Sequence, residues 1–492
     1  MSAVAHDAAS RSGEGRTALV VGAGLAGCLL AVYLARDGWK VTLCERRGDP
    51  RKAGSGGGRS INLAISARGL KALRRAGLEE KVLEEGVRMP GRVIHPVSGE
   101  PFFTPYSADP TRAINSVSRG GLNRLLLEAA EAEASCEVFF DRRAIEVDFE
   151  RGAVEFETPS GRERREADLV VGTDGAYSAI RAVMQKNERF DYTQEYLGHG
   201  YKELVIPPIA VGSGPHAPWA MDPAGLHIWP RGGSMMIALP NRDGSFTCTL
   251  FWPWEGPGSF AEIATPAQAT AHFRKVYPDA VPLMPTLEED YGRNPVGSLV
   301  TVRCRPWTRG GRVALLGDAA HAIVPFYGQG ANASFEDCEA LLEALRSHRE
   351  VPAALEAYEK ARKANGDAIA DLALRNFIEM RDLAGRRSFR IRKWFEHLLT
   401  RLFPNSFEPL YDRVSFGTKP YVEALATAHR HDRGFRLAAR LAIAALAVIL
   451  LAGAALLVSR GLVARDAKSR DREGPVASSH ASSHAAPATE SP

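Results

Sequence analysis

The feature that most constrains the fold lies near the start of the chain, where an apolar run, "TALVV" (17–21), leads directly into "GAGLAG". Gly22, Gly24 and Gly27 have the G-x-G-x-x-G spacing, and a helical segment, "CLLAVYLARDG", follows them. In a βαβ unit these glycines allow a tight turn, a close approach of the backbone to a pyrophosphate, and packing of the helix on the strand. The order of these segments predicts a dinucleotide-binding α/β domain.

A second apolar run, "KVTLCE" (40–45), follows that helix and ends on Glu45. In a dinucleotide-binding unit, a carboxylate at the end of the second strand accepts hydrogen bonds from a ribose hydroxyl group. A G-x-G-x-x-G motif alone is a weak signal, so the prediction depends on the full order of strand, glycines, helix, strand and acid. At this point the adenosine carrier can be NAD or FAD.

Two more apolar strands end in a pair of Asp and Gly. The run "DLVVGTDGAYSAIR" (168–181) places Asp174 after a strand, and "RVALLGDAAH" (312–321) places Asp318 after another. The segment "GQGANASFEDCEALLEAL" (328–345) then begins a helix. Because a helix N-terminus attracts anions, this second helix is expected to face a second phosphate group or a ribitol chain.

Length and composition exclude several classes of protein. A chain of 492 residues is too long for one ordinary core, so two or three domains are expected. A net charge of +4 on this length is too small to indicate a nucleic-acid partner. The six cysteines include no C-x-x-C pair, and no His cluster has metal-ligand spacing, so we predict a reduced compartment and no metal site.

Near the C-terminus, residues 441–458 form eighteen consecutive positions without a polar side chain. This length just suffices for a membrane-spanning helix, and the run extends to 437 if Arg440 reaches the interface with its charge. Seven of the eighteen residues are Ala, which weakens the signal, and a buried core helix is the alternative. We expect a single-pass transmembrane helix at 437–458 that anchors a cytosolic domain to the lipid bilayer, with disordered tails at 1–16 and 459–492.

The spacing of the three motifs resembles that of the flavoprotein aromatic hydroxylases of the p-hydroxybenzoate hydroxylase type. The resemblance implies an α/β fold, in which a Rossmann-type FAD-binding domain is joined to a β-sheet substrate domain and C-terminal helices. It also implies that Asp318 binds the ribitol chain and that the segment at Asp174 serves both FAD and NADPH. A FAD reductase or dehydrogenase of the same fold is the alternative. The cofactor-binding residues implied are Gly22, Gly24, Leu25, Gly27, Glu45, Arg46, Ala64, Arg119, Asp174, Gly317, Asp318, Gly330, Ala331 and Asn332.

Several further segments are similar to the kynurenine 3-monooxygenase family within that group. This resemblance implies NADPH-dependent hydroxylation of L-kynurenine to 3-hydroxy-L-kynurenine, in tryptophan degradation and NAD precursor synthesis, with O2 adding to reduced FAD as a C4a-hydroperoxide. Its partners are therefore L-kynurenine, NADPH and O2. The similar segments are "GRSINLAISARGLKALRRAGL" (58–78), "INSVSRGGLNRLLL" (114–127), "HGYKEL" (199–204), "LHIWPRG" (226–232), "VPFYGQGAN" (324–332) and "LRNFIEM" (374–380).

Kynurenine is a zwitterionic amino acid on an aromatic ring, so its site needs a cation, hydroxyl donors and apolar walls. By resemblance, Arg92 and Tyr106 hold the carboxylate, and Asn376 and Tyr411 complete the polar pocket. Phe246 and Phe326 are expected as ring walls, although both can be ordinary core residues. No side chain is assigned as acid or base. Tyr327 stands where other members have Phe or His, and His321 either positions the flavin loop or is satisfied by the backbone.

The domain boundaries follow from the motifs and from the alternation of β-type residues between them. The FAD-binding domain is expected to be discontinuous, at 17–85, 110–190 and 295–370, with a substrate domain at 86–109 and 191–294 and a helical region at 371–435. Two rival functions stay open: a monooxygenase of another aromatic or polyprenyl substrate, and a membrane-tethered flavin electron carrier.

Overall fold

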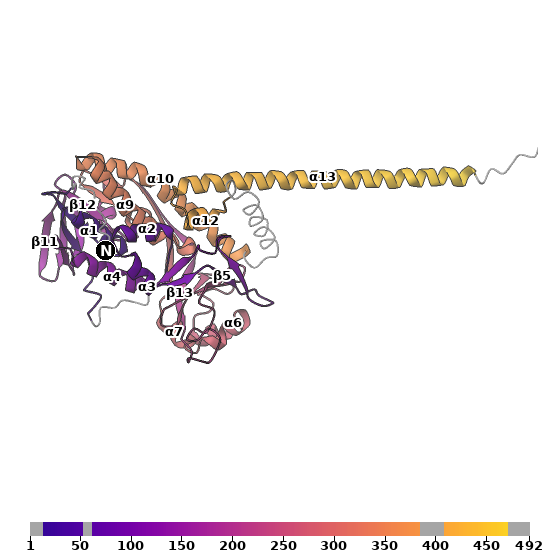
Figure 1. Ribbon diagram of the computed structural model, residues 1–492, viewed down its shortest axis with the longest axis horizontal. Helices are drawn as coiled ribbons and strands as arrows, with labels where there is room; N and C mark the ends of the chain where they lie inside the picture. The colour runs from indigo at the N-terminus through magenta and orange to yellow at the C-terminus, as the bar shows by residue number, and fades with distance from the viewer. Residues whose placement is uncertain (1–12, 53–61, 384–407, 471–492) are drawn as a thin grey trace, which may run out of the picture. The chain divides into compact units, whose positions relative to one another are not determined.

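The computed structural model describes residues 13–52, 62–383 and 408–470 (Figure 1). The chain divides into two compact units, Met1–Ala426 and Thr427–Pro492. The first unit contains every sheet of the described chain. Most of both predicted tails lies outside the described residues, but residues 459–470 belong to helix α13 (Tyr421–Arg470).

The first unit contains a six-stranded sheet that is parallel except at one edge. Its central strands are short and almost entirely apolar, as expected for a parallel sheet that is covered on both faces. Helices α1 (Leu25–Arg36), α4 (Arg119–Glu131) and α9 (Gly330–Ser347) lie in the same part of the molecule (Figure 1). In spatial order the strands are β18 (Thr308–Arg309), β19 (Val313–Leu315), β12 (Leu169–Gly172), β1 (Thr17–Val21), β2 (Lys40–Cys44) and β8 (Cys136–Phe139).

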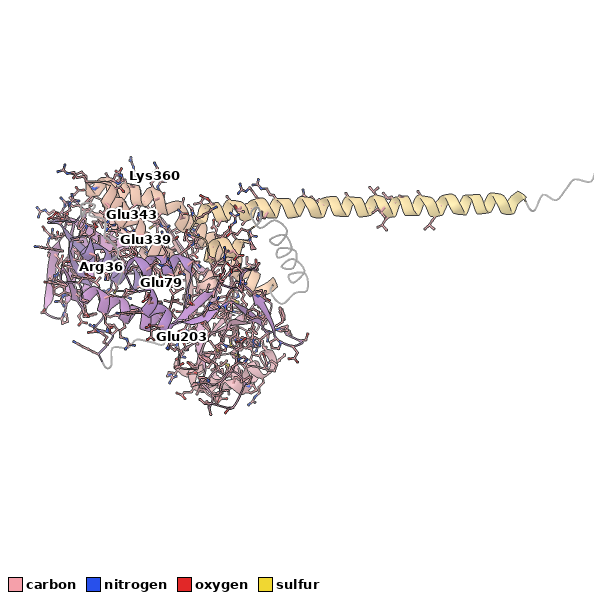
Figure 2. All side chains as sticks on the ribbon, viewed as in Figure 1. Arg36, Glu79, Glu203, Glu339, Glu343 and Lys360 are labelled. Atoms are coloured by element: carbon pink, nitrogen blue, oxygen red, sulfur yellow. The ribbon has the colours of Figure 1, made fainter. Side chains whose placement is uncertain are left out.

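Charged side chains project from these helices, as Figure 2 shows for Arg36, Glu339 and Glu343. Arg36 pairs with Glu133 at 2.6 Å, and helix α2 (Ala67–Arg75) pairs with α9 through Lys71–Glu339 at 3.2 Å and Arg75–Glu343 at 2.6 Å. Such exposed pairs contribute at most about 1 kcal/mol each. The stability of this layer therefore comes mainly from its apolar interior.

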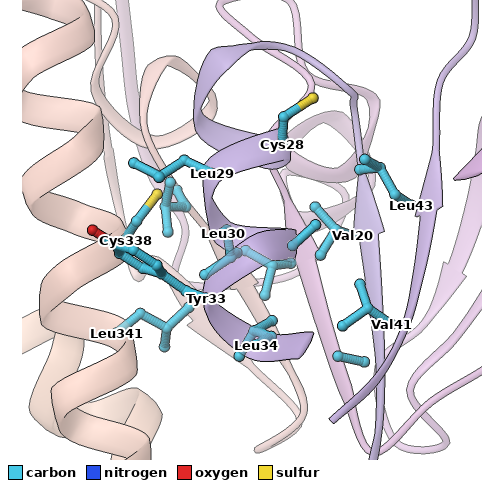
Figure 3. Close-up of a cluster of buried hydrophobic side chains, with 14 of the residues drawn as sticks. Val20, Cys28, Leu29, Leu30, Tyr33, Leu34, Val41, Leu43, Cys338 and Leu341 are labelled. Carbon is cyan, nitrogen blue, oxygen red and sulfur yellow. The ribbon is translucent and has the colours of Figure 1, made fainter. Parts of the chain in front are cut away.

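The interior of this unit lies between α1, the sheet and α9 (Figure 3). Leu30 and Leu34 of α1 lie near Val20 and Val41 of the sheet, and Cys338 and Leu341 project from α9. All these side chains are buried, and burying each large one contributes about 1.5–3 kcal/mol. This packing fixes the N-terminus of α1 against the end of β1.

Three parallel strands end side by side at the place where the motifs occur. Val21 pairs with Gly172, and Gly172 pairs with Leu315, so the carboxyl ends of β1, β12 and β19 are adjacent. The three segments that follow these strands therefore meet at one edge of the sheet. In open α/β sheets, ligands bind at this edge.

A second sheet of seven strands contains the residues predicted for the substrate domain. Strand β17 lies within the segment predicted for the FAD domain, but it pairs with β13, so this sheet extends beyond residue 294. In spatial order the strands are β17 (Gly297–Arg305), β13 (Asp191–Ile206), β16 (Phe246–Pro253), β15 (Met235–Pro240), β14 (Gly225–Pro230), β5 (Gly91–Ile94) and β6 (Phe102–Pro105).

The two faces of this sheet pack against different partners. Trp229 and Trp252 belong to a cluster that includes residues of α6 (Pro266–Val276) and α7 (Leu287–Arg293). Ile228 and Phe251, one residue away from them, belong to a different cluster with residues of α10 (Val351–Ile378). Because successive side chains of a strand point to opposite faces, each strand contributes to both clusters.

Smaller elements complete the first unit, and α10 continues into a π-helical turn at Glu379–Leu383. They are β3 (Leu63–Ile65), β4 (Val87–Met89) and β7 (Ile114–Val117) in one small sheet, β9 (Arg143–Asp148), β10 (Ala153–Thr158) and β11 (Gly161–Glu166) in another, and helices α3 (Glu79–Glu85), α5 (Ala179–Met184), α8 (Asp318–His321) and α12 (Leu410–Ser415).

Among the residues that the structure describes, no helix has both the length and the apolarity that crossing a membrane requires. The transmembrane helix expected at 437–458 is therefore not confirmed. The anchor and the location that it implies stay predictions from the sequence.

Candidate functional site

The three glycines of the G-x-G-x-x-G motif are required for different structural reasons. Gly22 has φ +109°, and a Cβ atom there would lie 2.7 Å from the carbonyl oxygen of Thr173. A Cβ atom at Gly27 would lie 1.9 Å from the carbonyl oxygen of Gly22. Nothing lies within 4 Å of a Cβ atom placed at Gly24. The chain's own packing thus requires Gly22 and Gly27, whereas Gly24 leaves open space that a ligand can enter.

The helix that follows this open space has free backbone donors. Helix α1 begins at Leu25, its N-cap Gly24 provides no side-chain cap, and no acidic residue lies in its first turn. Helix α9 begins at Gly330 in the same way, after Gln329, with Ala331 and Asn332 in its first turn. Both helix N-termini carry unsatisfied N–H groups and a partial positive charge, which suit phosphate oxygens.

Glu45 lies beside this turn, as its place after β2 predicted. Its Oε2 atom accepts a hydrogen bond from the Ala23 backbone N at 3.0 Å, and its Oε1 atom accepts one from the Arg47 backbone N at 3.1 Å. The carboxylate therefore holds the glycine turn in place and keeps lone pairs for a ribose hydroxyl group. Arg46 is exposed next to it.

Asp318 begins helix α8 after Gly317, which has φ +64°. Burial raises the pKa of the Asp318 carboxyl, and the nearby charges of Arg119 and His321 oppose that rise. The carboxylate makes no hydrogen bond or ion pair with any residue of the described ranges. A partly exposed carboxylate without a protein donor is free to accept hydrogen bonds, and the hydroxyl groups of a ribitol chain can donate them.

Asp174 has a local structural role as well as the predicted one. Its Oδ2 atom accepts hydrogen bonds from the backbone N atoms of Ala179 at 2.7 Å and Ile180 at 3.3 Å, which caps helix α5. Its Oδ1 atom is buried and has no partner in the described part of the chain, and burial raises the pKa of this carboxyl. Arg181 then ties this segment to α8, because its Nη1 atom donates to the Ala319 carbonyl at 2.7 Å.

Asn332 uses all the hydrogen-bonding capacity of its side chain within the protein. Its Nδ2 atom donates to the carbonyl oxygens of Ala64 at 2.9 Å and Gly328 at 2.7 Å. Its Oδ1 atom accepts from the backbone N atoms of Ser66 at 3.0 Å and Gly69 at 3.1 Å. Asn332 therefore joins loop 324–332 to the segment around Ala64, and contributes to the site by positioning backbone.

His321 lies in a buried ionic network that the sequence did not reveal. Its Nε2 atom lies 2.5 Å from Oδ2 of Asp337, and Nε of Arg362 donates to Oδ1 of Asp337 at 2.6 Å. Burial disfavours the Asp337 carboxylate, but His321 and Arg362 outweigh it and lower its pKa to about 2. Because Asp337 also accepts from the Gly317 backbone N at 3.2 Å, the network fixes the start of α8.

Arg92 lies beside two stacked tyrosine rings, on strand β5 next to the edge strand β6 of the seven-stranded sheet. Its Cζ atom is 5.2 Å from the ring centroid of Tyr106 and 4.7 Å from that of Tyr411. The two tyrosine rings are stacked, with centroids 4.5 Å apart. The Nε atom of Arg92 is buried and has no hydrogen-bond partner among the described residues. This cation is therefore stabilised by ring faces and retains a donor for an anionic ligand.

An apolar wall adjoins the arginine. Phe326 stacks on Phe377 with centroids 4.1 Å apart and lies 4.9 Å from the ring of Phe251. The Nδ2 atom of Asn376 donates to the Phe326 carbonyl at 2.7 Å, and the ring of Tyr327 stacks on Tyr411 at 5.6 Å. The structure thus brings together five of the predicted substrate residues, which we call the substrate cluster: Arg92, Tyr106, Phe326, Asn376 and Tyr411.

Phe246, the sixth predicted residue, is not brought to this cluster. It is fully buried in the other face of the sheet, where its ring meets that of His227 edge to face at 5.4 Å. Phe251 of the same strand meets Phe326 instead, because five residues along a strand reverse the side-chain direction. The alternation along this strand separates the two phenylalanines, but it does not indicate which face meets the loop.

Comparison with known proteins agrees with this arrangement. Residues 16–215 and 230–373 match the FAD binding domain family. The chain is 50% identical over 407 residues, 82% of its length and 87% of the relative's, to the kynurenine 3-monooxygenase of Myxococcus xanthus (strain DK1622). It is 48% identical over 445 residues, 90% of its length and 97% of the relative's, to the kynurenine 3-monooxygenase of Salinispora tropica.

A solved structure with the same fold is the tetrameric form of 2-methyl-3-hydroxypyridine-5-carboxylic acid oxygenase. The TM-score is 0.61 and the sequence identity 22%, and the match covers 76% of this chain and 95% of that one. At this identity the likeness concerns the fold. The chain thus has the aromatic-hydroxylase arrangement of a dinucleotide-binding domain and a second sheet.

Proposed function

Because this chain belongs to the kynurenine 3-monooxygenase family of FAD-dependent oxygen-inserting enzymes, we propose that it hydroxylates L-kynurenine to 3-hydroxy-L-kynurenine with NADPH as the electron donor. One observation carries the proposal beyond family membership. Loop 324–332 begins in the substrate cluster at Phe326 and ends at Asn332, whose amide contacts the segment around Ala64. One short loop would therefore lie between the flavin and the substrate.

The open turn at Gly24, the N-terminus of α1, and the carboxylates of Glu45 and Asp318 fit FAD. We call these groups, with Arg119, the cofactor cradle. Bound FAD supplies electron transfer from NADPH and the activation of O2. The free N–H groups of α1 would hold the pyrophosphate, Glu45 would accept from the ribose, and Asp318 would accept from the ribitol chain. Arg119, exposed at the start of α4, would face the flavin phosphate or ring.

Arg92 would bind the carboxylate of kynurenine. The pKa of the Tyr106 hydroxyl is raised well above its ordinary value by burial, and Tyr411 adds to this rise. The hydroxyl group therefore stays protonated and can donate a hydrogen bond to the same carboxylate. An arginine that packs beside two tyrosine rings with its Nε atom buried binds an anion more strongly than a solvated arginine does, because little water competes for it.

Phe326, Phe377 and Val324 are buried and would exclude water from the oxygen-transfer site. No acid or base on the protein is required at the ring, because the amino group of kynurenine donates electron density to the adjacent ring carbon. The chain's part is therefore placement of that carbon and exclusion of water. Burial also raises the pKa of Tyr327 well above its ordinary value, so this neighbouring hydroxyl group stays neutral.

The test is an oxygenation assay on purified, FAD-loaded protein in 18O2. We expect L-kynurenine to stimulate NADPH oxidation and to gain one labelled oxygen atom at the position beside its amino group. A panel of other aromatic acids and a polyprenyl phenol serves as the comparison. If NADPH oxidation is unaffected by kynurenine, or if another ring is labelled instead, the proposed substrate is wrong.

A further inference from the structure

Residues 58–78 form one of the segments that are similar to the kynurenine 3-monooxygenase family. Arg68, within this segment, has no role in the proposed function. It lies in α2, and its side chain is completely buried. A buried arginine is rare and needs partners for all its donors, because an uncompensated buried charge is strongly destabilising. Its partners therefore indicate what this residue holds in place.

Most donors of Arg68 bind one short segment near the end of the first unit. Its Nε atom donates to the Val414 carbonyl at 2.8 Å, and its Nη2 atom donates to the carbonyls of Lys419 at 2.6 Å and Arg413 at 3.2 Å. Its Cζ atom lies 4.0 Å from the ring centroid of Tyr421. We call residues 408–424, which contain α12 and the start of α13, the Tyr411 segment.

The remaining donor of Arg68 binds the FAD-binding part of the molecule. Its Nη1 atom donates to Oε1 of Glu336 in α9 at 2.6 Å. The residues on either side, Ser66 and Gly69, donate backbone hydrogen bonds to Asn332, which fixes loop 324–332. Arg68 thus lies between the Tyr411 segment and the start of α9.

The Tyr411 segment also contacts loop 324–332 directly. The Tyr421 hydroxyl donates to Oε1 of Gln329 at 3.0 Å, and Gln329 is the N-cap of α9, with only 1% of its surface exposed. Tyr421, whose ring packs on Arg68, therefore connects the Tyr411 segment to the loop that carries Phe326. Tyr411 and Phe326 both belong to the substrate cluster.

We propose that Arg68 is a positioning residue for kynurenine, which fixes the Tyr411 segment so that the ring of Tyr411 covers Arg92. This inference rests on the proposed function. A guanidinium group binds several carbonyls at once through its planar fork, whereas a lysine ammonium cannot reproduce this geometry. Tyr421 supports the same arrangement through Gln329. Arg68 touches neither the substrate nor the flavin in this account and acts through Tyr411.

The test measures the Kd for L-kynurenine from its effect on the absorbance of bound FAD. Arg68→Lys keeps the charge and the partner Glu336, and is expected to raise this Kd about tenfold or more, with FAD content and maximal rate retained. Arg75→Lys is the matched control, because Arg75 lies on the same helix and pairs with Glu343 of α9, labelled in Figure 2. The control should bind kynurenine as the wild type does.

A double-mutant cycle separates positioning from general destabilisation. If Arg68 acts through Tyr411, Arg68→Lys has little further effect on the Kd in a Tyr411→Ala background, whereas independent effects would multiply. An unchanged Kd in Arg68→Lys, or multiplying effects, overturns the inference. If Arg68→Lys does not fold, Tyr421→Phe decides: a raised Kd supports the inference, and a wild-type Kd overturns it. A wild-type protein that does not respond to kynurenine instead contradicts the proposed function.

Discussion

The cofactor cradle and the substrate cluster are built in opposite ways. The cradle combines backbone with charged side chains that follow strands directly: the Gly24 turn and the N-terminus of α1 come after β1, Glu45 after β2, and Asp318 shortly after β19. The substrate cluster consists of side chains from four separate parts of the sequence, which meet because the β5–β6 hairpin, a loop and two helices converge. The comparison shows why the cofactor cradle can be predicted from sequence motifs, whereas the substrate cluster cannot.

The two sites also differ in what stabilises a ligand. In the cradle, helix N-termini and two carboxylates offer hydrogen bonds to a phosphate-and-hydroxyl chain. In the cluster, the Arg92 cation beside two stacked tyrosine rings offers charge in a place with little water. Changes in one site are therefore expected to leave ligand binding in the other site intact.

The largest effect is expected from Gly24→Val. The added side chain meets no protein atom within 4 Å at its Cβ and fills the space assigned to the pyrophosphate. We expect the variant to fold but to lose nearly all bound FAD, which the ratio of flavin absorbance to protein absorbance measures. The melting temperature of the FAD-free variant should equal that of FAD-free wild type. A yellow variant with full flavin content would contradict the role of this space.

Arg92→Met is expected to weaken kynurenine binding by about 2–5 kcal/mol while FAD content stays unchanged, because it removes the charge but keeps apolar contact with the two rings. The Kd from flavin absorbance measures the effect. An unchanged Kd would remove Arg92 from the site, and loss of FAD would show that the two regions are not separable.

The far face of the seven-stranded sheet provides a pH test of stability. Burial holds His227 neutral and lowers its pKa from 6.5 to about 4; its Nε2 atom meets the Asp222 carbonyl at 2.8 Å, and its Nδ1 atom meets His95 at 2.9 Å. Below pH 6.5 this histidine binds a proton in the unfolded chain but not in the folded chain. The free energy of unfolding is therefore highest above pH 6.5 and decreases as the pH falls toward 4, by up to about 3 kcal/mol.

His227→Gln should remove this pH dependence. Urea midpoints at about pH 7.5 and about pH 5 are expected to differ less in the variant than in the wild type, by the equivalent of about 2 kcal/mol. Groups that do not contact His227 are common to both proteins, so the difference reports His227 together with its hydrogen-bond partner His95. Equal pH dependence in the two proteins would contradict its neutral, buried state.

The smallest effect distinguishes the two phenylalanines. Phe326→Leu should increase the share of NADPH that yields hydrogen peroxide, because it opens the apolar wall at Phe377. Phe246→Leu should lower stability through lost packing but leave this share at the wild-type level, because Phe246 packs on the other face. Hydrogen peroxide formed per NADPH consumed gives the result, and equal leakage in both variants would contradict the assignment of faces.

The sequence predicted the family and the FAD-binding aromatic-hydroxylase fold, and both are confirmed. The sequence was sufficient for this prediction because each motif of the cradle is local. Neighbours in the sequence fix the role of a glycine with positive φ, such as Gly22, and of an acid directly after a strand, such as Glu45. The apolar run at 437–458 has no such local motif. Its apolarity alone does not decide between a membrane-spanning helix and a buried core helix.

The parts of the site that the sequence did not predict depend on tertiary contacts, which no local sequence pattern encodes. Phe246 and Phe251 lie on one strand, and only tertiary packing decides which of them meets Phe326. The network of His321, Asp337 and Arg362 joins three positions whose separation in the sequence has no characteristic spacing. Arg68 lies in a segment that is similar to the kynurenine 3-monooxygenase family, but its role became apparent only from the carbonyl groups that surround it.

The central claim is that the kynurenine carboxylate binds at Arg92, independently of the flavin. Titration of FAD-loaded wild type and Arg92→Met with L-kynurenine and with kynuramine, which lacks the carboxylate, tests it most directly. We expect the wild type to prefer kynurenine strongly and the variant to bind both ligands equally weakly. The same preference for kynurenine in both proteins would contradict the account.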